Sequence, residues 1–116
     1  MVLNNNNQKN LPQNKIKFVL NLFNSNKFTE AKKEIQDQLI TYPSSAILYN
    51  ILGAIFASEN KFINAIKNYE KAIQLNPSYA QAYNNLGNTL YKLNKVDDSI
   101  YNYKKKIKYK NDFAEA

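Results

Sequence analysis

The 116-residue chain contains no cysteine, no histidine and no arginine, and it has only two glycines. Without cysteine it forms neither disulfides nor thiolate metal sites. Without histidine it lacks the commonest metal ligand and the usual general base. Two glycines are too few for a glycine-rich phosphate-binding loop. The composition therefore predicts a protein with no metal, cofactor or catalytic site, and hence not an enzyme by itself.

The charge is of one basic type: all 16 basic residues are lysine, against 9 acidic residues, for a net charge of +7. Bidentate binding of phosphate or carboxylate prefers the arginine guanidinium, so binding to nucleic acid would depend on lysine point charges. Asparagine is also abundant. Lysine and asparagine are typical of A/T-rich codons, so the basicity reflects either codon usage, with no nucleic-acid partner, or selection for a basic protein.

Long hydrophobic runs are absent as well. The longest apolar stretch is Ile51 to Ala57, whereas a membrane helix needs about 20 residues. The start of the chain, Met1 to Asn7, has no apolar segment of the kind found in secretory signals. We therefore expect no membrane association and a cytoplasmic location.

An internal repeat with a period of about 34 residues is the most informative feature that is present. The two glycines are one period apart, and so are two of the prolines and three Asn-Lys pairs that precede an apolar residue. The matching sets are Gly53 and Gly87, Pro43 and Pro77, and Asn26, Asn60 and Asn94.

Within each period the apolar spacing is helical. Tyr49, Leu52, Gly53 and Phe56 lie at positions i, i+3, i+4 and i+7, on one face of a helix. A second helix with the same spacing follows a short polar break. The pattern predicts helices over 12–25, 28–41, 45–58, 62–75, 79–93 and 96–109.

The breaks have a local chemistry. Asparagine tolerates the left-handed backbone conformation well, so we expect it where each first helix ends, at Asn26, Asn60 and Asn94. Proline cannot continue a helix, so Pro43 and Pro77 should end second helices, with Ser44 and Ser78 capping the next ones. Glycine inside a helix is unfavourable, so Gly53 and Gly87 are predicted to be points of close helix contact.

This pattern resembles the tetratricopeptide repeat (TPR) family over about residues 12–113. The second repeat matches the family signature most fully, and the third retains its aromatic, leucine and glycine positions. The first is weakest, with Lys15, Val19 and Gln38 in place of an aromatic residue, a glycine and an alanine. The matching residues are Leu22, Ala31, Pro43, Tyr49, Leu52, Gly53, Phe56, Ala65, Tyr69, Ala72, Pro77, Tyr83, Leu86, Gly87, Leu90 and Tyr103, and further departures are Ser99, Lys106 and Asn111.

The resemblance implies an all-α fold, a right-handed superhelix of stacked antiparallel helix-turn-helix hairpins. We expect an Asn-rich disordered tail over 1–11, repeats over 12–44, 45–78 and 79–112, and the start of a truncated fourth repeat at 113–116. Residues 112–116 parallel residues 78–82, the opening of the third repeat. The sequence is therefore expected to be part of a longer protein or the product of a truncated gene.

The family usually binds peptides on its concave face, lined by the first helix of each repeat. A protein or peptide partner is therefore expected, and the face would change from apolar to amide-rich along the stack. The apolar residues either form a pocket for partner side chains or are covered by a tight superhelix or the N-terminal tail. The groove candidates are Ile16, Lys17, Leu20, Ile47, Asn50, Ile51, Ala54, Gln81, Asn84, Asn85, Asn88 and Lys92.

Asn85 resembles the inner-face asparagine with which the repeats of O-linked sugar transferases hold a peptide backbone. The chain would then be the substrate-recruiting arm of a larger glycosyltransferase or sulfotransferase; otherwise Asn85 only reflects the composition. The chaperone co-factors of the family instead clamp a C-terminal carboxylate with Lys and Arg. That ligand is not expected, because Asn50 and Ala54 replace the clamp residues and arginine is absent.

The last predicted helix carries a lysine run whose opposite face, Ile100, Tyr103 and Ile107, is expected to join the core. The run is either a solvated helix face or, less favoured, a contact for RNA aided by Tyr101 and Tyr109. Asp97 and Asp98 open this helix and need no catalytic role. The lysines are Lys104, Lys105, Lys106, Lys108 and Lys110.

Overall fold

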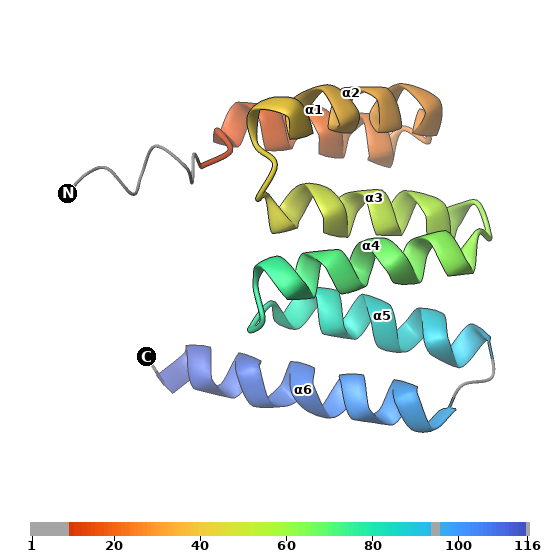
Figure 1. The fold of residues 1–116 in the computed structure, drawn as a ribbon, viewed down its shortest axis with the longest axis vertical. Coiled ribbons are helices and arrows are strands. Elements are labelled where there is room, and N and C mark those ends of the chain that lie inside the picture. Colours follow the sequence, from red (N-terminus) through yellow and green to blue (C-terminus); the bar gives the residue numbers. More distant parts are fainter. Residues whose placement is uncertain (1–9, 94–95, 116) are drawn as a thin grey trace.

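The computed structural model describes residues 10–93 and 96–115, with side chains described for 10–93 and 100–110. These residues form six helices and no strand. Figure 1 shows them as antiparallel pairs stacked one on another, which confirms an all-α solenoid of helical hairpins. The helices are α1 (Gln13–Asn24), α2 (Phe28–Thr41), α3 (Ala46–Ser58), α4 (Phe62–Leu75), α5 (Ala80–Lys92) and α6 (Val96–Glu115).

The first five helices agree with the predicted ranges to within one residue at each end. Helices α2 and α4 end at Thr41 and Leu75, two residues before Pro43 and Pro77, as expected where proline stops a helix. Helix α6 is longer than predicted, because position 111 carries Asn rather than a helix-breaking proline. The division of the chain into repeats, including a fourth that starts at 113, remains a prediction.

The turns between the paired helices have the predicted backbone. Asn26 and Asn60 have φ values of 60° and 62°, in the left-handed region. The third such position, Asn94, lies outside the described residues. Left-handed asparagine at the end of a helix lets the chain reverse within a few residues, so α1–α2 and α3–α4 close as tight hairpins.

The predicted serine caps were wrong. Helix α3 is capped by Ser45, whose Oγ accepts a hydrogen bond from the Leu48 N–H at 3.3 Å, and not by Ser44. Helix α5 follows Tyr79 with no side-chain cap, while the Ser78 N–H bonds to Asn76. The turn after each proline takes one residue more than the sequence pattern suggested, which moves the helix start past the predicted serine.

The core runs along the stack as two clusters of buried side chains. The first joins α1, α2 and α3 and contains the fully buried Val19, Ile35, Leu48 and Ile55. The second joins α4 and α5 through Ala65, Tyr69, Leu86 and Leu90. Each cluster spans neighbouring hairpins, so the hairpins stabilise one another as in other repeat proteins.

Gly53 is a point of close helix contact, as predicted. A Cβ atom at this position would lie 2.6 Å from Cε1 of the Tyr69 ring. Real side chains do not approach so closely, so only glycine leaves room for the tyrosine between α3 and α4. Gly87, the equivalent position in α5, is also buried.

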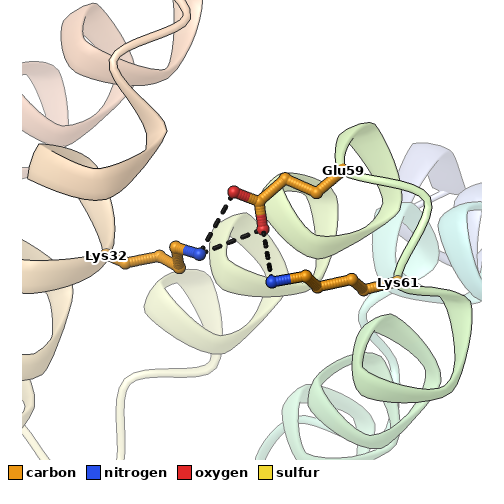
Figure 2. Close-up of polar contacts among 3 residues, drawn as sticks. All are labelled: Lys32, Glu59 and Lys61. Atoms are coloured by element: carbon orange, nitrogen blue, oxygen red, sulfur yellow. Dashed lines mark hydrogen bonds and ion pairs between the residues drawn. The ribbon is translucent and has the colours of Figure 1, made fainter.

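A charged contact ties the first hairpin to the second (Figure 2). The Lys32 ammonium of α2 lies 3.0 Å from Oε1 and 3.1 Å from Oε2 of Glu59, in the turn after α3. Lys61 approaches the same carboxylate at 3.9 Å. The Lys32 ammonium also lies 5.2 Å from the centre of the Phe56 ring. Glu59 thus balances two lysines at the junction of the hairpins.

The apolar face of α6 differs from the prediction. Ile100 and Ile107 were expected in the core, but they are 47% and 56% exposed. Tyr103 is half-buried. Of the described helices only α5 packs against α6. The side of α6 that carries the two isoleucines is therefore not covered by another described helix. Among the described helices, none has both the length and the apolarity needed to cross a membrane.

Candidate functional site

The predicted groove residues come from α1, α3 and α5, but the structure does not leave all of them accessible. Asn50 is 7% and Ile51 is 6% exposed, and Ile51 belongs to the first core cluster. Neither side chain is accessible from a groove, and the burial of Ile51 fits the alternative that a tight superhelix covers it. Helix α3 packs beside both α1 and α5, the first helices of the neighbouring hairpins. Part of the α3 surface that faces away from α4 is therefore covered by these two helices; we call each such contact between first helices a seam.

A chain of polar contacts crosses the seam between α3 and α5. The Asn85 amide nitrogen donates to Asn50 Oδ1 at 3.0 Å, and the Asn50 amide nitrogen donates to the Tyr79 hydroxyl at 3.3 Å. Burial raises the pKa of Tyr79, and its hydrogen bond with Asn50 opposes that shift. Asn85 was predicted to bind a peptide backbone, but one of its amide protons is used in this hydrogen bond within the protein.

Two other amides of α5, Asn84 and Asn88, are also engaged, in this case by α6. The Lys106 ammonium donates to Asn84 Oδ1 at 2.9 Å, and the Tyr103 hydroxyl donates to Asn88 Oδ1. Lys106 stands where the family has alanine, and the structure explains it as a partner for Asn84. Much of the amide-lined end predicted for a ligand therefore serves helix packing.

The remaining predicted residues are dispersed. Lys17 and Leu20 are exposed on α1, while Ile16 and Ala54 are half-buried. The Lys92 ammonium lies 5.8 Å from the centre of the Phe62 ring, at the far end of the α4–α5 pair. These side chains do not line the hollow described next.

A hollow of about 670 Å³ lies where α3 and α5 begin and α6 nears its end. Its lining is mainly apolar, and two predicted groove residues, Ile47 and Gln81, contribute to it. A smaller hollow of about 190 Å³ shares Ala80, Gln81 and Lys110 with it and adds Asn84 and Lys106. The larger hollow is lined by Ile47, Asn76, Ser78, Tyr79, Ala80, Gln81, Tyr109 and Lys110.

The contribution of α6 to this hollow was missed by sequence reasoning. Tyr109 stacks on Tyr83, with ring centres 5.7 Å apart and planes 22° from parallel. Burial raises the pKa of Tyr83, and its hydroxyl donates to the Pro77 carbonyl at 2.9 Å. The stack holds the last part of α6 against α5, where Lys110 reaches the edge of the hollow. The only signal was the presence of tyrosine at 109 beside the lysine run.

The chemistry available here is that of a binding surface. Exposed Ile47 and the half-buried rings of Tyr79 and Tyr109 offer apolar contact, and Lys106 and Lys110 supply positive charge. Among the described residues, no three His, Cys, Asp or Glu side chains gather where they could hold a metal ion. The arrangement suits a ligand with an apolar group next to an acidic or polar one.

Comparison with known families identifies two matching segments. A family model described as TPR repeat matches residues 53–94. A second, described as Tetratricopeptide repeat, matches residues 80–113. Together they span more than half of the 116 residues. A search of curated proteins found no match.

Solved structures with the same fold include MamA, with a TM-score of 0.80 at 22% identity over 88% of this chain. MamA from Desulfovibrio magneticus RS-1 has a TM-score of 0.76 at 15% identity over 84% of this chain. The present chain spans 60% and 55% of those two chains. The second TPR of Spaghetti (RPAP3), bound to HSP90 peptide SRMEEVD, has a TM-score of 0.75 at 18% identity, covering 81% of this chain and 87% of that one.

Proposed function

Because the chain belongs to the tetratricopeptide repeat family, we propose that it is a protein-interaction module that binds an extended peptide segment of a partner protein. TPR repeats are typically non-catalytic interaction motifs, and the proposal assigns no reaction to this chain. It also keeps the expected cytoplasmic location.

One observation carries the proposal: the apolar hollow bordered by lysines where α3 and α5 begin. Ile47 is 37% exposed there, beside Tyr79 and Tyr109. An apolar side chain of a peptide would gain free energy by leaving water for this hollow. Lys110 at its edge would attract an acidic neighbour of that side chain, and the exposed Gln81 amide would bond to the peptide backbone.

The structural neighbours support a peptide ligand without specifying its sequence. The second TPR of RPAP3 holds an HSP90 peptide, but a likeness at 18% identity transfers only the fold. In the present chain Asn50, at a position where the carboxylate clamp needs lysine, is buried and bonded to Tyr79. We therefore propose an internal peptide segment rather than a C-terminal carboxylate as the ligand.

Two alternative functions each depend on a different feature of the chain. A substrate-recruiting arm of a glycosyltransferase or sulfotransferase would use Asn85 on a peptide backbone, yet Asn85 already bonds to Asn50. An RNA-associated module would use Lys104 and Lys108, which are exposed on α6. Neither has the support of a hollow comparable to the one beside Ile47.

Selection of peptides from a displayed library, followed by titration of one selected peptide, tests the proposal. We expect micromolar affinity, since few groups anchor the peptide and no arginine contributes a charge-assisted pair. Ile47→Asp should weaken binding at least about tenfold, because it places a charge in the apolar hollow. Ile63→Asp is the matched control, since Ile63 is 56% exposed on α4 and does not line the hollow.

Equal binding by the Ile47 and Ile63 variants would contradict the proposed site. Titration with an RNA oligonucleotide at low and high salt addresses the alternative. Tight RNA binding that falls steeply with salt, and disappears when Lys104, Lys105 and Lys108 are neutralised, would favour the nucleic-acid function.

A further inference from the structure

The exposed isoleucines of α6 lie at the same repeat positions as the isoleucines with which α4 packs against α5. Ile100 and Ile107 lie one repeat period after Ile66 and Ile73 of α4. Those two pack against the cluster that contains Leu86 and Leu90 of α5. Helix α6 therefore presents the surface with which α4 receives the first helix of the next hairpin.

The opposite end of the stack presents the complementary surface. Phe18 and Leu22 of α1 lie two periods before Leu86 and Leu90, so they are the equivalents of the residues that α5 turns toward α4. Phe18 is 50% exposed, although it is a large apolar side chain. The first hairpin thus has the face that fits a preceding helix of the α4 type.

Two hollows show that the exposed face of α1 and α2 is equivalent to a face of α5 and α6 that α4 contacts within the chain. One, of about 360 Å³, lies on α1 and α2 and includes Phe18 and Glu34; another, of about 520 Å³, lies between α4, α5 and α6 and includes Leu86 and Asn102. These residues are equivalent in pairs, two periods apart. The second hollow has a wall from α4 that the first lacks, formed by Glu70, Ile73 and Gln74.

The residues of α6 that would supply the missing wall have complementary charge. Lys104, Ile107 and Lys108 lie one period after Glu70, Ile73 and Gln74, and all three are exposed. The α1–α2 hollow contains three acidic side chains and one lysine, and opposite charges across a contact favour association. Its charged residues are Glu30, Lys33, Glu34 and Asp37.

We propose that this chain associates head to tail with a second copy of itself. The α6 face of one copy, formed by Ile100, Lys104, Ile107 and Lys108, docks onto the α1–α2 hollow of the next copy. The contact reproduces between copies the packing of α4 against α5 within one copy. Because the two surfaces differ, the association is open-ended and can add further copies.

Sedimentation or light scattering of the chain over a range of concentrations tests the proposal. The measured mass should rise above 13.4 kDa with concentration, and continue past twice that value. Ile107→Lys blocks the α6 face and Phe18→Lys blocks the α1 face. Each variant should remain monomeric with unchanged helicity, since both side chains are half exposed or more.

Mixing the two blocked variants gives the sharper result, because one retains a free α1 face and the other a free α6 face. Their equimolar mixture should form a one-to-one dimer that does not grow. Lys104→Glu with Lys108→Glu should reduce self-association at least about tenfold. A wild-type chain that stays monomeric at several hundred micromolar, self-association by the Phe18 variant, or a mixture that stays monomeric would each overturn the proposal.

Discussion

The first and second repeats fill the same place between their two helices in different ways. In the second, Gly53 of α3 leaves space for the ring of Tyr69 in α4. In the first, the equivalent positions one period earlier hold Val19 and Ile35, and both are fully buried. A small residue beside a large one has become two of intermediate size.

We infer from this difference that the positions of a repeat signature are coupled. Read singly, Val19 in place of glycine makes the first repeat look degenerate. Read with Ile35, it is an exchange in which one side chain becomes larger and its partner smaller, so that both fit between the same two helices. A departure from the signature therefore weakens a repeat only where its partner position has not changed with it.

Gln38 is such an uncompensated departure. Its second-repeat equivalent, Ala72, is fully buried. The Gln38 amide nitrogen donates to Glu34 at 2.9 Å and to the Lys15 carbonyl at 3.4 Å, but its buried Oε1 has no partner among the described residues. An unpaired buried acceptor carries a desolvation cost.

Breaking the glycine–tyrosine pair should have the largest effect. Gly53→Val places a Cβ atom 2.6 Å from the Tyr69 ring, and we expect a loss of about 3 kcal/mol in the free energy of unfolding. Valine has a better helix propensity than glycine, so a loss cannot be a propensity effect. Chemical denaturation followed by circular dichroism measures it.

The coupling itself is tested by adding Tyr69→Ile, which recreates the first-repeat pair in the second repeat. The double variant should be more stable than the sum of the two single losses predicts, by at least about 1 kcal/mol. Strict additivity of the two losses would show that the positions are independent and would invalidate the comparison.

Alkaline pH should act on the second repeat through its buried Tyr69, for which the first repeat has Ile35. Burial raises the pKa of Tyr69 to about 12, while its hydrogen bond with Thr89 opposes the shift. Folding therefore favours the protonated hydroxyl; this stability is complete below about pH 10 and is lost as pH rises toward 12, by about 2 kcal/mol. Denaturation at a series of alkaline pH values checks it.

Tyr69→Phe is the control, since it keeps the ring and removes the ionising group. The free energy of unfolding of wild type, minus that of this variant, should fall as the pH rises above the ordinary tyrosine pKa. If the difference stays constant through that rise, the hydroxyl of Tyr69 ionises as in the unfolded chain.

The turns, in contrast, should behave alike in both repeats. Asn26 and Asn60 share the left-handed conformation. Replacement of either by glycine should be neutral or slightly stabilising, whereas replacement by valine should cost about 1 kcal/mol or more. Melting temperatures of the four variants measure this, and equal values for the Gly and Val variants at one position would contradict the assigned turn.

The smallest effect is expected at Gln38. Gln38→Met keeps the length of the side chain, removes the unpaired Oε1 and gives up two hydrogen bonds of the amide nitrogen. The opposing terms should leave the stability within about 1 kcal/mol of wild type. A loss of several kcal/mol in the free energy of unfolding, measured by chemical denaturation, would mean that the hydrogen bonds of Gln38 are essential to the stability of the first repeat.

Most of the fold was predictable because it depends on local signals that recur. The apolar spacing, the prolines and the left-handed asparagines placed five helices to within one residue. The prediction failed where a local signal was missing. With no proline at 111, nothing in the sequence marked where α6 ends. Only the packing of the helices shows that α5 leaves Ile100 and Ile107 exposed.

The candidate site was predicted less well, since it depends on how neighbouring hairpins meet. Helical spacing correctly put Ile47 and Gln81 on the first helices of their repeats, and both reach the apolar hollow. The same spacing left open whether Ile51 would be covered, and it gave no sign that Asn50 would bond to Asn85. Contacts between hairpins depend on the rotation from one hairpin to the next, which periodicity alone does not determine.

The Asn50–Asn85 bond has a mechanical consequence for the solenoid. Its equivalents one junction earlier are Ile16 and Ile51, so an amide pair at one junction corresponds to an apolar pair at the other. A hydrogen bond tolerates a narrow range of distances and angles, whereas apolar contact is non-directional. Along the seam of the first helices, the contact should thus be stiffer between the second and third hairpins than between the first and second, whose directional contact lies elsewhere, between Lys32 of α2 and Glu59 in the turn after α3.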